Sequence, residues 1–96
     1  METLSEAIAR LRARGFIRDF TAVAGGRLRC EECGLEFDPS KVHIDEIVRF
    51  EGESDPGDES ILYALSGPCG HLGLYSAAYG PDATPEDIAV APLLHR

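Results

Sequence analysis

The chain has 96 residues, of which 44% are hydrophobic and 27% charged, and its formal net charge is −8. These values are typical of one small globular domain spanning residues 1–96, and they exclude a low-complexity chain. No apolar run approaches the roughly 20 residues that cross a bilayer, so a membrane-spanning helix is excluded as well. The N-terminus lacks the apolar stretch of a secretory signal, and we therefore expect a cytoplasmic protein.

The charge is divided unevenly along the chain. Residues 1–29 carry six arginines against three acids, a net +3, whereas residues 30–96 carry three basic residues against 14 acids, a net −11. Because a phosphate backbone repels so acidic a chain, we do not expect nucleic acid as a partner. We expect the arginines of the first 29 residues to neutralise acidic residues within the fold or across a homodimer.

The first predicted element is a helix that begins after Thr3 and ends before Gly15. Thr3 and Glu6 have the spacing of a capping box, in which each side chain accepts a hydrogen bond from the other residue's backbone N–H. Gly15 is a typical residue just past the end of a helix. Apolar residues at helical spacing predict one buried stripe, made by Leu4, Ile8 and Leu11.

Short strands joined by short turns are predicted after this helix, and short connections favour antiparallel neighbours. Thr84 then caps a short C-terminal helix with Pro85 at its first position. The predicted fold is therefore α+β: an antiparallel sheet of three to five strands with both helices on one face. The strand-like segments besides residues 42–50 are 20–24, 61–65 and 72–79.

The most strand-like segment spans residues 42–50. Its alternation breaks at Glu46 and Ile47, which predicts a β-bulge or a second buried face. Residues 51–59 are acidic and rich in turn formers, which predicts a solvated acidic loop. Two roles stay open for it: a protein partner binds there, or the loop only keeps the protein soluble. Four apolar residues of the strand are expected to share one side, namely Val42, Ile44, Val48 and Phe50.

All three cysteines lie in two short motifs. Cys30 and Cys33 are separated by two residues, and Cys69 is followed at a spacing of two by His71. An odd number of cysteines fits a disulfide framework poorly and fits metal ligation better when a histidine accompanies them. Tetrahedral zinc accepts a Cys₃His set. We therefore predict a structural zinc site with the ligands Cys30, Cys33, Cys69 and His71.

A zinc-knuckle-like turn is predicted at the first motif, because the two-residue spacing lets both sulfurs reach one ion. Gly34 allows the positive φ that such a turn needs. In an extended segment, the side chains of Cys69 and His71 would point to the same face. The acids between the first two cysteines are expected to be solvated and not ligating. His43 is the substitute fourth ligand if His71 points away.

Other interpretations stay open beside a zinc-binding module with a binding or regulatory role. Cys30 and Cys33 alone would suit a thiol redox sensor, although the acids between them would raise their pKa values. The three cysteines would otherwise be ordinary ones without a metal. An enzyme or binder for a small phosphorylated metabolite would use Arg49 and the first-helix arginines, with Asp45 and Tyr63 beside them. Catalysis at the metal is disfavoured, because four soft ligands close the site.

One further set of segments covers most of the chain, namely 3–7, 14–16, 19–20, 43–52, 54–56 and 61–66. These segments resemble a family of small bacterial proteins of about this length, which often carry the label phosphoribosylpyrophosphate synthetase. The resemblance implies a shared fold. It implies no activity, because Asp45 and Glu46 are not followed by the Thr/Gly-rich turn of a pyrophosphate-binding loop.

Overall fold

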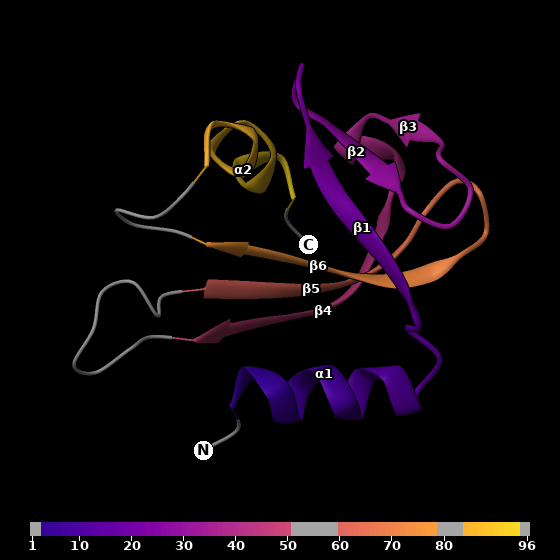
Figure 1. The fold of residues 1–96 in the computed structure, drawn as a ribbon, viewed down its shortest axis with the longest axis vertical. Coiled ribbons are helices and arrows are strands. Elements are labelled where there is room, and N and C mark those ends of the chain that lie inside the picture. The colour runs from indigo at the N-terminus through magenta and orange to yellow at the C-terminus, as the bar shows by residue number, and fades with distance from the viewer. Residues whose placement is uncertain (1–2, 51–59, 79–83, 95–96) are drawn as a thin grey trace.

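The computed structural model describes residues 3–50, 60–78 and 84–94, which form two helices and a curved sheet (Figure 1). Helix α1 spans Leu4–Ala13 and helix α2 spans Pro85–Val90. The predicted acidic loop, residues 51–59, lies outside the described residues. The strands are β1 Arg18–Val23, β2 Arg27–Cys30, β3 Glu36–Phe37, β4 His43–Phe50, β5 Ser60–Ser66 and β6 Leu72–Ala78.

The six strands form one mixed sheet in the order β3-β2-β1-β6-β5-β4. Four neighbouring pairs are antiparallel, as predicted, namely β1–β2, β2–β3, β4–β5 and β5–β6. However, β1 and β6 are parallel, with Arg18 opposite Gly73 and Asp19 opposite Leu74. The prediction of an antiparallel sheet of three to five strands is therefore wrong in strand number and in this pairing. Short turns determine the direction of sequence neighbours only, and β1 and β6 are separated by all the other strands.

Helix α1 begins with the predicted capping box. The N–H of Glu6 donates to Thr3 Oγ1 at 3.1 Å, and the N–H of Thr3 donates to Glu6 Oε1 at 2.9 Å. The helix ends at Ala13, and Gly15 follows with a φ of 107°. Ala7 and Leu11 are fully buried, so the predicted apolar stripe faces the sheet.

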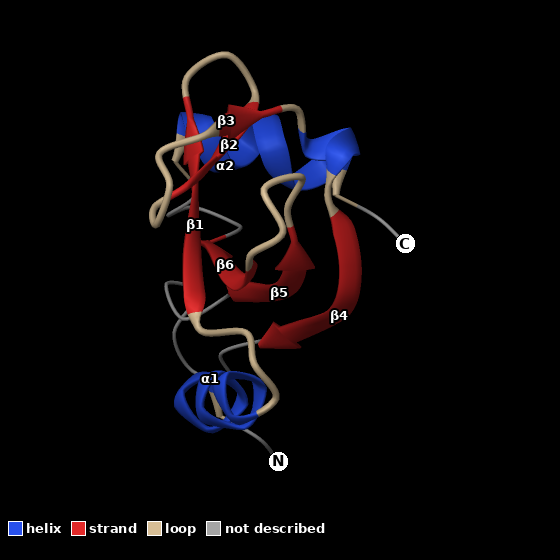
Figure 2. Ribbon diagram, turned by 90° about the vertical axis from the view of Figure 1, so that its right-hand side faces the viewer, coloured by secondary structure: helices blue, strands red, loops and turns tan. Residues whose placement is uncertain are grey.

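The two helices cover opposite faces of the sheet (Figure 2), which corrects the prediction that both lie on one face. Strand β5 explains why, because its buried residues alternate between the two faces. Leu62 and Ala64 pack in the cluster that contains Leu11 of α1. Tyr63 and Leu65 pack in the other cluster, together with residues of the C-terminal segment. A strand that is apolar on both sides needs a cover on each face.

Strand β4 contains the predicted β-bulge. Ile44 lies opposite Leu65 and Glu46 lies opposite Ala64, so Asp45 is the extra residue. The bulge moves the later residues to the other face. Ile44 packs in the cluster below α2, whereas Val48 and Phe50 pack against the α1 cluster. The expectation that Val42, Ile44, Val48 and Phe50 share one side is therefore wrong.

The first-helix arginines neutralise acids within the fold. Arg10 lies 2.6 Å from a carboxylate oxygen of Glu46, and its hydrogen bonds lower the pKa of Glu46. Arg14 lies 3.2 Å from Asp45. These pairs attach α1 to the bulge of β4, and each contributes at most about 1 kcal/mol because it is partly exposed. Further ion pairs among the described residues include Arg14–Glu46, Arg12–Asp19 and, from β1, Arg18–Glu32.

Helix α2 is attached to the sheet by a buried side chain. Thr84 caps it by accepting a hydrogen bond from the N–H of Asp87 at 3.1 Å. The hydroxyl of Tyr75 in β6 donates to the carboxylate of Asp87, and burial raises the pKa of Tyr75. Among the described residues, neither helix is long and apolar enough to cross a membrane.

Candidate metal centre

Two hairpin loops at one end of the sheet carry the predicted ligands. Cys30 is the last residue of β2 and Cys33 lies in the loop between β2 and β3, whereas the loop between β5 and β6 carries Cys69 and His71. Cys30 lies opposite Phe20 in β1, and β1 starts beside the start of β6. The parallel pairing of β1 and β6 therefore brings together two motifs whose first cysteines are 39 residues apart.

The first loop is a closed turn of the predicted zinc-knuckle-like kind. The N–H of Gly34 donates to the carbonyl of Cys30 at 2.7 Å, and the N–H of Cys30 donates to the carbonyl of Leu35 at 2.9 Å. Gly34 has a φ of 73°, which an L side chain rarely adopts. These bonds close the turn that contains both cysteines.

The two acids of this turn bind β1 and do not belong to the ligand group. The carboxylate of Glu31 accepts a hydrogen bond from Thr21 Oγ1 at 2.7 Å, and the Glu31 N–H donates to the carbonyl of Asp19. Glu32 lies 3.4 Å from Arg18. Sequence reasoning missed Arg18 and Thr21 as supports of the site, because only the pairing of β1 with β2 shows which residues face the turn.

The second loop is a turn and not the extended segment that we predicted. The N–H of Gly67 donates to the carbonyl of His71 at 3.1 Å, and the N–H of Gly70 donates to the carbonyl of Gly67 at 3.0 Å. Gly70 has a φ of 84°. The chain therefore bends between Cys69 and His71, and because of this bend the two side chains approach each other.

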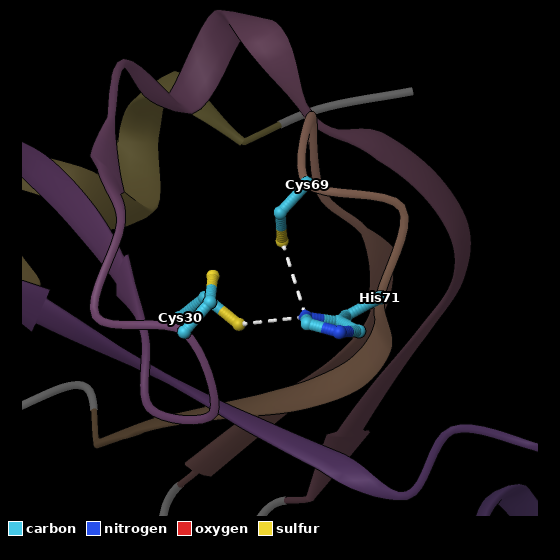
Figure 3. A group of neighbouring side chains, drawn as sticks. Cys30, Cys69 and His71 are labelled. Atoms are coloured by element: carbon cyan, nitrogen blue, oxygen red, sulfur yellow. Dashed lines mark hydrogen bonds between the residues drawn. The ribbon is translucent and has the colours of Figure 1, made fainter.

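The side chains of Cys30, Cys69 and His71 point toward one another (Figure 3), and Cys33 belongs to the same group. Cys30 Sγ and Cys69 Sγ each lie 3.4 Å from the same ring nitrogen, His71 Nδ1. The four ligand atoms, including Cys33 Sγ, all lie within 4.8 Å of one another. In a zinc tetrahedron with Zn–S near 2.3 Å and Zn–N near 2.0–2.1 Å, sulfur and nitrogen stand about 3.5 Å apart. The group therefore has the size of a four-coordinate site.

His43 is not part of this group. Its side chain is exposed at the start of β4, where it lies opposite Ser66. Among the described residues, the group that lies within reach of one ion contains His71 and not His43. His71 is accordingly the better candidate for the fourth ligand.

The three thiols differ in exposure. Cys30 is fully buried in the core cluster, Cys69 is half-buried against it, and Cys33 is exposed. A hydrogen bond from the backbone of Leu35 lowers the pKa of Cys33. Burial raises the pKa of Cys69, and a hydrogen bond from the backbone of His71 opposes that increase. Of these last two thiols, the exposed Cys33 therefore forms a thiolate more readily than Cys69.

Comparison of the chain with family models, with curated proteins and with solved structures found no match. The resemblance to the small bacterial family labelled phosphoribosylpyrophosphate synthetase stays a prediction. The function of the chain is therefore inferred from the geometry and the chemistry of the ligand group.

Proposed function

We propose that this chain is a small zinc protein in which Cys30, Cys33, Cys69 and His71 bind one Zn²⁺. The observation that carries the proposal is the convergence of four ligand atoms within 4.8 Å, from two loops that are far apart in the sequence. Sulfur ligands favour soft ions, and a tetrahedral set of three sulfurs and one imidazole nitrogen is typical of structural zinc.

The role of the ion on this proposal is structural. The ion would connect the β2–β3 loop to the β5–β6 loop, and all four of its ligands would come from the protein. Catalytic zinc keeps one position open for water, and three thiolates make the ion a weak Lewis acid. We therefore infer a binding or regulatory module and not an enzyme.

The alternative of a phosphorylated-metabolite site has less support. The first-helix arginines that would bind phosphate form ion pairs with carboxylates, Arg10 with Glu46 and Arg14 with Asp45. Tyr63, which this alternative would place in a pocket, is 3% exposed and stacks on the ring of Tyr75. A phosphate group would have to displace these ion pairs before the arginines could bind it.

The test replaces each histidine in turn. His71→Ala is expected to weaken zinc binding by more than about 100-fold, because even the loss of an outer-shell partner costs 10–100-fold. His43→Ala, the matched control, is expected to bind zinc like the wild type, since its exposed side chain lies outside the ligand group. Competition titration of each purified protein against a zinc chelator measures the affinities. Equal affinities for both variants would contradict the proposed ligand set.

A further inference from the structure

The ligand group presents one thiol to solvent. Of the three cysteines, Cys33 is exposed, Cys69 is half-buried and Cys30 is fully buried. Metal coordination keeps cysteine ligands deprotonated, and the thiolate is the form that reacts with oxidants. A reagent that arrives from solvent therefore meets Cys33 before it meets the other two sulfurs.

The partner of Cys33 in a disulfide is determined by the turn. Cys30, at the end of β2, and Cys33 lie in one turn, which is closed by the hydrogen bonds from Gly34 to Cys30 and from Cys30 to Leu35. These bonds do not depend on the ion. Cys69 lies in the other hairpin loop, and its place beside this turn depends on the pairing of β1 with β6 and, on the proposed function, on the ion. Once coordination fails, Cys30 is the thiol that stays beside Cys33.

We propose that Cys33 is an oxidation site, at which a peroxide opens the zinc site with Cys30 as the resolving thiol. The inference rests on the proposed zinc site and adds its regulation. The reagent that would oxidise Cys33 is a two-electron oxidant, and hydrogen peroxide is the probe used in the test below. Oxidation removes two of the four ligands from the ion, so zinc dissociates. At the same time a disulfide forms between Cys30 and Cys33 within the turn.

The two chemical steps balance. The Cys33 thiolate attacks one oxygen of hydrogen peroxide, an S–O bond forms, the O–O bond breaks and hydroxide leaves, so that sulfur loses two electrons to the peroxide. The Cys30 thiolate then attacks the sulfur of the Cys33 sulfenic acid, the S–S bond forms, the S–O bond breaks and a second hydroxide leaves. Two protons from the acid form of the buffer convert both hydroxides to water, and a thiol reductant reverses the disulfide.

The wild-type protein provides the first test. Zinc binding is measured before peroxide is added, and its absence at that stage would refute the proposed function and not the oxidation step alone. Zinc-loaded protein is then treated with hydrogen peroxide, with a chromogenic chelator to record zinc release and dimedone to trap sulfenic acid. Trypsin cleavage after Arg29 and Lys41 separates the peptide that contains Cys30 and Cys33 from the peptide that contains Cys69.

The expected result is zinc release, a dimedone adduct on Cys33, and, without dimedone, a Cys30–Cys33 peptide lighter by two hydrogen atoms. Retention of zinc under peroxide, or an adduct or disulfide that involves Cys69, would overturn the inference while leaving the zinc site intact. Because this mapping uses the wild-type chain, it decides the question even if a variant fails to fold.

Two matched variants that keep four ligands add a second test. Cys33→His removes the exposed thiol, and this variant is expected to retain zinc under peroxide concentrations that empty the wild type. Cys69→His keeps both cysteines of the turn, and it is expected to lose zinc and form the Cys30–Cys33 disulfide as the wild type does. Equal sensitivity of Cys33→His and the wild type, or resistance of Cys69→His, would overturn the inference.

Discussion

Removal of zinc by a chelator is expected to lower the thermal unfolding midpoint of this protein by about 15–30 °C. The reason is the position of the ligand group, which joins two hairpin loops at the end of the sheet where β1 meets β6. Without the ion, the contact between these loops depends on side-chain packing and on the short parallel pairing of β1 with β6. The bound ion stabilises the folded chain only, because the unfolded chain lacks a preformed site.

The size of the expected shift follows from mass action. Free zinc at about 1,000 times its dissociation constant stabilises the folded state by about 4 kcal/mol. In a domain of 60–100 residues, each kcal/mol corresponds to about 4–8 °C in the midpoint. A contribution of this size is a large part of the stability of any small domain, which is about 5–15 kcal/mol.

Differential scanning calorimetry of the zinc-loaded protein, with and without excess chelator, measures this shift. The control is His71→Ala, whose midpoint is expected to be insensitive to the chelator because one ligand is missing. A wild-type midpoint that does not move when zinc has been removed, as verified by elemental analysis, would show that the ion has no structural role.

Gly73→Ala is expected to destabilise the protein by about 2–3 kcal/mol and to weaken zinc binding with it. A Cβ atom at Gly73 would lie 2.6 Å from the carbonyl oxygen of Arg18 and 2.7 Å from Cε2 of Phe20. Both distances are shorter than van der Waals contact, and the first involves backbone that no rotamer change can move. Strand β1 would therefore have to shift away from β6, and this pairing is the one that brings the two ligand loops together.

Ser76→Ala is the matched control for this substitution. Ser76 lies on the same strand with an exposed side chain, so the change to alanine is expected to stay within about 0.5 kcal/mol of the wild type. Urea unfolding curves of the zinc-loaded proteins give the free energy of unfolding of each variant. If Gly73→Ala were as stable as Ser76→Ala, this result would contradict the conclusion that β1 lies too close to β6 at Gly73 to admit a Cβ atom.

The features that could be predicted from the sequence are those that depend on neighbouring residues. The capping box of Thr3 and Glu6, the stop at Gly15 and the knuckle-like turn ending at Gly34 are local, and the structure contains all three. The proximity of Cys30, Cys33, Cys69 and His71 was also predictable, because each of two short motifs offers a pair of metal-ligating side chains. The structure places the four within reach of one ion.

The features that could not be predicted depend on contacts between distant residues. Nothing near Arg18 or Gly73 indicates that their strands run parallel side by side. The bulge at Asp45 was visible as a break in alternation, but its effect on Val48 required knowledge of the cover on each face. The loop between β5 and β6 also differs from the prediction, because the chain bends at Gly70 where we expected an extended segment from Cys69 to His71.

The most direct measurement of the central claim is X-ray absorption spectroscopy at the zinc edge of the purified, zinc-loaded protein. The proposed ligand set predicts one zinc per chain with three sulfur neighbours at about 2.3 Å and one nitrogen neighbour at about 2.0–2.1 Å. A first shell dominated by oxygen or nitrogen, or a protein that takes up no zinc, would contradict it.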